Sequence, residues 1–333
     1  MRTRLLLKGL FLSLFFIAFT THATPTPQNK LIQASYLGEF TEETAALVLK
    51  KSPPLDTLAV HYALELYRIE YRTPAPDGSE AVASGLVVLP KNPEKPVGIV
   101  TYLHGTRFER NDVPSRNNQK NYMYLAAFSS SGGYAAVMPD YLGLGDSNLN
   151  LHPYVQAETL ASSSIDMLLA AKEFFKQSHY PINEKLYLAG YSEGGFTTIV
   201  MFEKLIKDYP HIPITAVAAG SAPYDWLETM KFVMFKPGPR ATAYLAYFFY
   251  SLQTYKHYWA SMDEIFLPPF NTLIPQLFDG QHNTQEVLQA LPPHPLQILQ
   301  PNLIGSIIYG DDPHTEDLIM NFNHYYFIPT APL

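Results

Sequence analysis

The sequence predicts an α/β fold with a mostly parallel sheet and flanking helices. Two segments, residues 160–175 and 196–206, have apolar residues at spacings of three and four, which predicts helices. Strands that alternate with helices imply right-handed crossovers between parallel strands. Four continuous apolar runs are typical of buried parallel strands, and they are VGIVTYLHG from 97, YAAVMPD from 134, KLYLAGY from 185 and ITAVAAGSAP from 214.

The chain ahead of these strands has a different pattern. LYRIEYRTPAPDGSEAVASGLVVLP, residues 66–90, predicts two strands joined by a turn at Pro76-Asp77-Gly78. Residues 24–50 are interpreted as an export linker that leads into a short helix. With 333 residues, 47% of them hydrophobic and 16% charged, the chain can bury a large core. We expect one α/β domain, with or without a sizeable insertion.

Residues 1–23 have the three parts of a secretory signal peptide. Arg2, Arg4 and Lys8 form a basic end, residues 10–19 are apolar, and residues 21–23 (THA) form a cleavage site. An N-terminal membrane anchor is the alternative, although the apolar stretch is shorter than the roughly 20 residues of a spanning helix. We expect the protein to be secreted or periplasmic.

Charge and cysteine content exclude several classes of function. The net charge of −7 becomes −10 when the three basic residues of segment 1–23 are removed. An acidic surface repels phosphate backbones, which argues against nucleic acid as a partner. The chain has no cysteine, which excludes zinc–thiolate sites and cysteine nucleophiles. No motif has metal-ligand spacing, and no cofactor is expected.

The pattern loosens after Pro223. Residues 224–330 are rich in proline, lack the strand–helix alternation and contain the aromatic stretch AYLAYFFYSLQTYKHYW, residues 243–259. We interpret residues 24–223 as the core and residues 224–330 as a helical cap inserted over the carboxyl edge of the sheet. The aromatic side chains either line a tunnel for an acyl chain or pack the cap onto the sheet.

Ser192 is the candidate nucleophile. Gly190-Tyr191-Ser192-Glu193-Gly194 fits the G-x-S-x-G pattern, in which a serine occupies a sharp turn from strand to helix. Gly190 and Gly194 remove side chains that would collide in that turn. The N–H of Glu193 then points to where a carbonyl oxygen becomes negative. The Glu193 side chain is expected to be a solvated carboxylate favoured by the helix dipole, without a role as a general acid.

The residues after the first two parallel strands are expected to support this turn. Gly105 lets the chain approach the serine, and the N–H of Thr106 is the second candidate donor to the oxyanion. His104 is expected to brace this loop, with a role as the catalytic base as the alternative. Asp140 precedes the serine, whereas the triad acid of this motif follows it, so we expect Asp140 to order the loop of Gly143 and Gly145.

These motifs together resemble the secretory lipase group of the α/β-hydrolase superfamily. The resemblance rests on five motifs in this order, and it covers roughly residues 60–330: LHGT, VPS, PDYLGLG, GYSEGG and GSAPYD. It implies the α/β-hydrolase fold, a cap that shapes an acyl pocket, and a Ser…Asp…His triad that attacks carboxylic esters. Ser192 carries over as the nucleophile, and Thr106 and Glu193 as the oxyanion donors.

The carboxyl end departs from this group. The triad acid and base of the group follow two strands beyond the cap, and residues 331–333 look like the entrance to the first of these strands. We therefore expect a C-terminally truncated chain whose last sheet strands, acid and base are missing. Asp311 and His314 are weak candidates for these roles within the chain.

The sequence thus predicts an exported serine hydrolase of carboxylic esters, lipase-like or esterase-like, which degrades lipid or small esters and is inactive in a form that lacks the triad acid and base. A serine peptidase on the same fold and a non-catalytic remnant or binding protein are the alternatives. Transient contact with a membrane or lipid surface and the oligomeric state are left open.

Overall fold

The computed structural model describes residues 29–116, 119–310 and 314. Its sheet contains seven strands, namely β1 Leu31–Phe40, β2 Leu64–Pro74, β3 Glu80–Pro90, β4 Val97–Leu103, β5 Ala135–Pro139, β6 Ile182–Tyr191 and β7 Ala216–Gly220. The described helices are α1 Glu42–Lys50, α2 Tyr122–Tyr124, α3 Ala157–Gln177, α4 Glu193–Asp208, α5 Trp226–Phe235, α6 Pro239–Lys256, α7 Phe270–Leu277, α8 Thr284–Ala290 and α9 Pro301–Tyr309. A π-helix, Leu125–Ser131, continues α2.

The sheet has the order β1-β2-β3-β5-β4-β6-β7. β4 pairs in parallel with β5 and β6, and β6 with β7, while the three pairings among β1, β2, β3 and β5 are antiparallel. The predicted α/β class is confirmed, and the sheet is mixed, with its parallel half at β5-β4-β6-β7. All six strands predicted from the sequence are present, as are the two helices, which α3 and α4 extend at both ends.

Residues 31–40 are a correction to the sequence interpretation. They form the edge strand β1, which pairs with β2, and they are not part of a linker. Most of the β1 side chains are exposed or half-buried, and LIQASYLGEF lacks the apolar alternation of a half-buried strand. The short helix expected after the linker is α1, whose first turn is capped by the Thr41 side chain.

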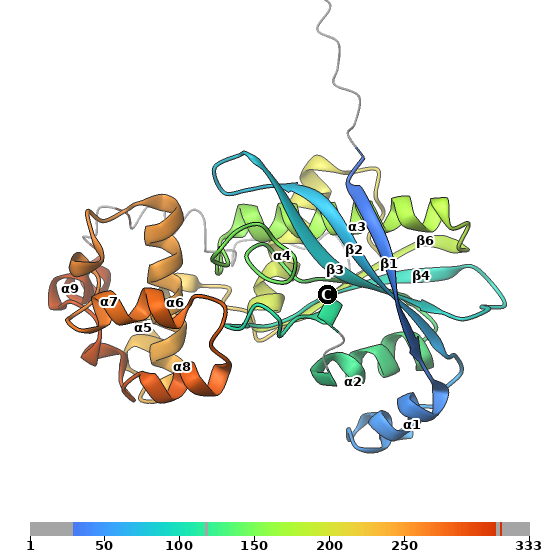
Figure 1. Ribbon diagram of the computed structural model, residues 1–333, viewed down its shortest axis with the longest axis horizontal. Helices are drawn as coiled ribbons and strands as arrows, with labels where there is room; N and C mark the ends of the chain where they lie inside the picture. Colours follow the sequence, from blue (N-terminus) through green and yellow to red (C-terminus); the bar gives the residue numbers. More distant parts are fainter. Residues whose placement is uncertain (1–28, 117–118, 311–313, 315–333) are drawn as a thin grey trace, which may run out of the picture.

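Helices cover both faces of the sheet (Figure 1). Successive side chains of a strand point to opposite faces. On β5, Ala135 and Val137 pack into the core with α3 and α4, while Ala136 and Met138 pack into the core with α1 and the π-helix. This two-sided burial explains why the β5 sequence is apolar throughout.

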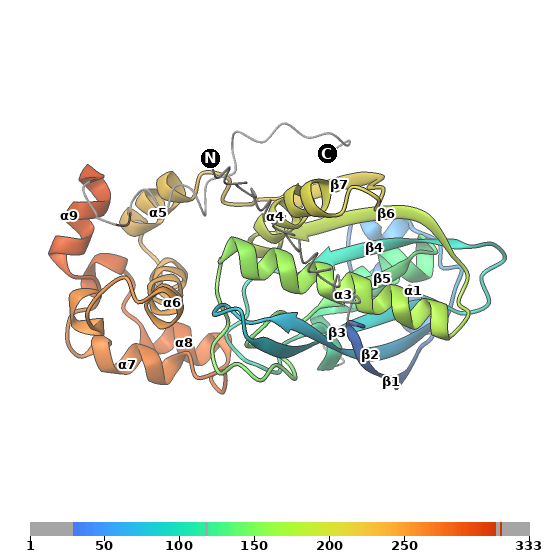
Figure 2. The same ribbon diagram turned by 90° about the horizontal axis from the view of Figure 1, so that it is seen from above.

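Helices α5 to α9 form a separate cluster beside the sheet (Figure 2). The cluster begins directly after β7, and α5 and α6 face the serine turn across a cavity. These helices span residues 226–309, within the segment 224–330 that we interpret as a cap from the sequence. Residues 1–28, which include the predicted signal peptide, and residues 331–333 lie outside the described residues. No described helix has the length and apolarity of a membrane span.

Candidate active site

Ser192 lies in a sharp turn between β6 and α4. Its backbone has φ 60° and ψ −122°, which is strained for a residue with a side chain. The turn is held on both sides, because the Ser192 N–H donates to the Gly220 carbonyl over 2.8 Å and the Ser192 carbonyl accepts from the Phe196 N–H over 3.0 Å. The pairing of β6 with β7 continues to Tyr191 and Gly220. The neighbouring strand therefore helps to maintain the strained conformation.

The two elbow glycines are required for different reasons. A Cβ at position 190 would lie 2.1 Å from the carbonyl oxygen of Gly194, so this collision occurs within the turn itself. A Cβ at position 194 would lie 1.9 Å from the carbonyl oxygen of Leu103, at the end of β4. Gly194 therefore allows α4 to pack directly against the strand that carries the predicted oxyanion loop.

The loop after β4 lies against the serine. A Cβ added at Gly105 would lie 3.2 Å from the Tyr191 carbonyl oxygen and 3.5 Å from Ser192 Cβ. Among the described residues, the backbone N–H groups of Thr106 and Glu193 donate to no protein acceptor. Two free N–H groups near a nucleophile are what an oxyanion site needs. The Thr106 side chain is occupied elsewhere, because its hydroxyl lies 3.0 Å from that of Tyr154.

A mainly apolar cavity of about 170 Å³ opens at Ser192. Ser192, Glu193 and Ser221 line its core side, and Trp226, Met230 and Val233 of α5 with Leu245 of α6 line its cap side. The aromatic side chains of α6 lie in two kinds of surroundings. Tyr244 lines the cavity, whereas Tyr247, Phe248 and Phe249 are buried in the core.

Comparisons with known proteins place the chain among the hydrolases. The Prolyl oligopeptidase family profile matches residues 120–258. A crystal structure of a proposed hydrolase from Legionella pneumophila is 68% identical over 91% of this chain and 82% of the other, with a TM-score of 0.90. The chain belongs to the same family as this hydrolase and has the α/β-hydrolase fold.

Two further structures share the fold of the present chain at lower sequence identity. The rice cell wall degrading esterase LipA from Xanthomonas oryzae is 22% identical over 92% of this chain and 82% of the other, with a TM-score of 0.81. Candida antarctica lipase A is 15% identical over 85% and 64% of the two chains, with a TM-score of 0.60. A comparison with curated proteins gave no match.

His104 of this hydrolase is buried behind the oxyanion loop. Nδ1 lies 2.8 Å from the Gly105 carbonyl oxygen and Nε2 lies 3.3 Å from that of Asp140. Burial, assisted by the positive charge of Arg107, lowers the pKa of His104 to about 3. The ring is therefore neutral near pH 7, with one N–H to donate, and its contacts suit the predicted bracing role better than that of a base.

Asp140 is fully buried and joins three segments of the chain. Its carboxylate accepts hydrogen bonds from the hydroxyl of Ser84 on β3 over 2.6 Å and from the hydroxyl and N–H of Ser115. Burial raises the pKa of Asp140, and the Ser115 and Ser84 hydrogen bonds oppose that shift. A Cβ at Gly145 would lie 2.5 Å from the Asp140 carboxylate, so the glycine loop packs on this group, as its predicted ordering role requires.

The prediction of a solvated Glu193 side chain is wrong. The side chain is only 1% exposed, and its Oε1 lies 2.7 Å from Nε2 of His152, which is equally buried. The prediction treated the first turn of α4 as a helix end that is exposed to solvent. In the structure the loop that follows β5 covers the N-terminus of α4. The loop supplies a partner that makes burial of the carboxyl group tolerable.

His152 is the site residue that sequence reasoning missed. It lies in residues 140–156, a long connection with little regular structure between β5 and α3, whose residues 151–156 are all buried. Long irregular connections inside compact domains are often functional. The length of this connection is the one feature of the sequence that could have indicated a functional segment. No local pattern links His152 to Glu193, which lies 41 residues further along the chain.

His314 does not reach the candidate nucleophile. Its Nε2 donates to the Tyr258 carbonyl over 2.8 Å, and its ring stacks on Tyr258 at 4.2 Å. It lines a different cavity, together with Tyr258 and Trp259. Asp311, the other weak candidate, lies outside the described residues. Among the described residues, no histidine makes a hydrogen bond to the Ser192 hydroxyl.

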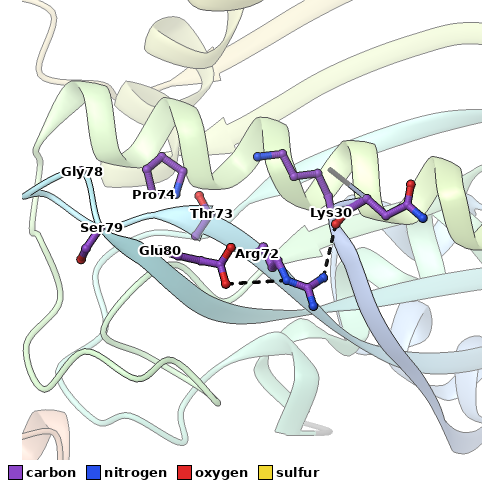
Figure 3. A pocket seen from close by; sticks show the side chains of 8 residues that line it. Lys30, Arg72, Thr73, Pro74, Gly78, Ser79 and Glu80 are labelled. Carbon is purple, nitrogen blue, oxygen red and sulfur yellow. Dashed lines mark hydrogen bonds and ion pairs between the residues drawn. The ribbon is translucent and has the colours of Figure 1, made fainter. Parts of the chain in front are cut away.

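A second hollow lies at the β2–β3 hairpin, beside the start of β1 (Figure 3). Both of its cationic side chains are held by carboxylates. Arg72 Nε lies 3.7 Å from Glu80, and Lys30 Nζ lies 2.8 Å from the buried Asp166. These ion pairs help to fix the start of β1 to the sheet. We assign no second reaction centre to this hollow.

Proposed function

We propose that this hydrolase cleaves carboxylic esters, with Ser192 as the nucleophile and an acyl-enzyme as the intermediate. The observation that carries the proposal is the position of Ser192, which has a strained backbone, lines a mainly apolar cavity and lies against the Gly105 loop, with free N–H groups on the neighbouring residues Glu193 and Thr106. The hydroxyl would attack the ester carbonyl, and the N–H groups of Thr106 and Glu193 would stabilise the tetrahedral oxyanion. The ester C–O bond would then break and release the alcohol, and water would cleave the acyl-enzyme to give the acid and free Ser192. The cavity would hold the acyl group of a small or lipid ester.

A serine hydroxyl is a weak nucleophile at its ordinary acidity and needs a base to accept its proton. The resemblance assigns that role to a histidine beyond the cap, oriented by an aspartate. The oxyanion site and substrate binding would by themselves retain roughly 10³–10⁴-fold acceleration over water. Turnover and labelling of the serine are therefore separate measurements.

A fluorophosphonate probe tests the nucleophile. In a chain long enough to include the histidine that the resemblance implies, we expect one label per chain, located at Ser192 by mass spectrometry and absent from Ser192→Ala. Ser221 lines the same cavity, so Ser221→Ala is the matched control and should still be labelled. Labelling that persists in Ser192→Ala would refute the proposal.

Peptide cleavage is the second candidate, favoured by the Prolyl oligopeptidase family match. Amide and ester cleavage pass through the same kind of oxyanion, so the elbow does not separate them. The chain should be given p-nitrophenyl butyrate and a prolyl peptide anilide in parallel. Faster cleavage of the ester supports the first proposal, and faster cleavage of the anilide supports the second.

Export is proposed from the pattern of residues 1–23. A C-terminally tagged chain should be recovered outside the cytoplasm with a new N-terminus after Ala23. Recovery of uncleaved protein in the membrane fraction would instead support an N-terminal anchor. If the substrate is a lipid ester, we also propose transient contact with a lipid surface during catalysis.

A further inference from the structure

Glu193 and His152 form a buried contact directly beneath the candidate nucleophile. Glu193 follows Ser192 in the sequence and begins α4, while His152 comes from the loop between β5 and α3. Glu193 Oε1 lies 2.7 Å from His152 Nε2, and both side chains are 1% exposed. The other ring nitrogen, Nδ1, lies 2.7 Å from the Leu142 carbonyl oxygen. His152 therefore connects the first residue of α4 to the glycine loop that Asp140 orders.

The hydrogen bonds determine how many protons this pair holds. A carbonyl oxygen can only accept, so His152 Nδ1 carries a proton and donates it to Leu142. The short contact between Nε2 and Oε1 needs one further proton, which belongs either to the ring or to the carboxyl group. In both cases the pair has no net charge. Glu193 Oε2 is buried and accepts no hydrogen bond among the described residues, so His152 is the described partner that offsets this carboxyl group.

The surroundings exclude water from the pair. The His152 ring stacks on the Tyr141 ring, with 5.6 Å between ring centroids. The ring centroids of Tyr154 and Tyr247 lie 6.3 and 6.2 Å from that of His152. Burial raises the pKa of all three tyrosines. An uncompensated charge in such surroundings would be costly.

The backbone of residue 193 explains why this pairing matters for chemistry. Its N–H is one of the two groups assigned to the oxyanion, and its direction depends on how the first turn of α4 is held. A bare carboxylate on the same residue would also oppose the negative charge of the transition state. Because the pair has no net charge, this repulsion is weakened, and the contact with His152 holds the peptide in place.

We propose that Glu193 and His152 are positioning residues, a neutral pair sharing one proton that aligns the N–H of residue 193 with the oxyanion. This inference rests on the proposed function, because it assumes an oxyanion at Ser192. It assigns no proton transfer with substrate to either residue.

Two substitutions at position 193 separate pairing from mere packing. Glu193→Gln keeps the shape, and its amide can donate to His152 Nε2 while Nδ1 still donates to Leu142. We expect the labelling rate of Ser192 by a fluorophosphonate to stay within about 3-fold of wild type. Glu193→Leu fills the space without a partner for His152. We expect its labelling rate and kcat to fall about 10²-fold with KM nearly unchanged, since loss of one oxyanion donor costs 10²–10³-fold.

His152→Phe and the double variant test whether the pair acts as a unit. The double variant Glu193→Leu/His152→Phe should lose no more than the more impaired single variant, because residues that act together are not additive. Glu203→Leu makes the same change further along α4 and should keep the wild-type rate. Thermal melts of each variant establish that it is folded. Proton NMR provides a readout independent of activity, a downfield resonance on the pair that disappears in both Glu193 variants and in His152→Phe.

The outcomes separate the two proposals. Wild-type protein that is not labelled at Ser192 would overturn the proposed function and this inference together. Normal labelling of wild type with an equal rate for Glu193→Leu would overturn this inference alone. Folded Glu193→Gln that loses as much as Glu193→Leu would also overturn it, as would the absence of the shared-proton resonance from wild type.

Discussion

Replacing Gly194 by alanine should damage the candidate active site through a collision of backbone atoms. The new Cβ would lie 1.9 Å from the Leu103 carbonyl oxygen and 2.7 Å from that of His104. Cβ atoms essentially never approach other heavy atoms closer than 3.0 Å, so the end of β4 and the start of α4 must separate by about 1.1 Å. Because the opposing atoms are backbone, no side-chain rotation can relieve the strain.

The magnitude follows from this displacement. Overpacking a close-packed interior costs about 1–3 kcal/mol, and the backbone collision places this variant at the upper end. A loss of about 3 kcal/mol corresponds to a melting temperature lowered by roughly 4–5 °C for a domain of this size. A displacement of about 1 Å at the oxyanion loop should slow labelling of Ser192 roughly 10²-fold.

Gly305 provides the matched control for this substitution. It lies inside α9, and a Cβ there would meet no heavy atom within 4 Å. Gly305→Ala should therefore be neutral or stabilising by about 0.5–1 kcal/mol, since alanine favours the helix. Melting is followed by circular dichroism, and labelling by gel fluorescence over time. A Gly194→Ala protein that melts and reacts like wild type would show that the crowding argument is wrong.

Three further substitutions test other parts of the site. The folded-state pKa of His104 is about 3, below its ordinary 6.5, so the stability that comes from its neutral state is complete above pH 6.5 and is lost as the pH falls toward 3. Between pH 7 and 4.5, urea unfolding of wild type should lose about 2.5 kcal/mol that His104→Asn does not lose, and equal losses would contradict the assignment. Met230→Ala enlarges the cavity at Ser192 and should raise the ratio of kcat/KM for octanoate to butyrate esters, at a cost of about 2–5 kcal/mol in stability; an unchanged ratio would remove Met230 from the acyl pocket. Thr106→Ala keeps the backbone N–H, so labelling should slow by less than about 5-fold, and a loss of 10²-fold or more would assign the role to the hydroxyl instead.

The parallel half of the sheet could be predicted because local and tertiary preferences agree there. The β5 sequence is apolar on both faces, and both faces are covered by helices. The turn at Ser192 was predictable for a similar reason, since Gly190 and Gly194 are forced by collisions with nearby backbone. In both places the residue type is set by contacts that any chain with this fold must make.

The parts that were missed depend on contacts without a local pattern. Strand β1 pairs along one edge only, and most of its side chains are at least partly exposed. Polar and apolar residues are therefore both tolerated in it, without a regular alternation. The burial of Glu193 depends on His152, and nothing in the helix that begins at Glu193 predicts a histidine from a distant loop. The burial and the partners of a residue cannot be predicted from its local sequence when a distant segment provides them.

The aromatic contacts between cap and core limit how a substrate can enter. Tyr247 of α6 stacks between Tyr154 of the core loop and Phe278 of the cap, with 4.7 Å between ring centroids on each side. Phe108 packs edge-on against both cap rings at 5.4 Å. Swinging the whole cap away would pull this stack apart and expose several large rings to water at once. Admission of substrate by small rotations of side chains at the rim, with the cap fixed as a wall, is far less costly.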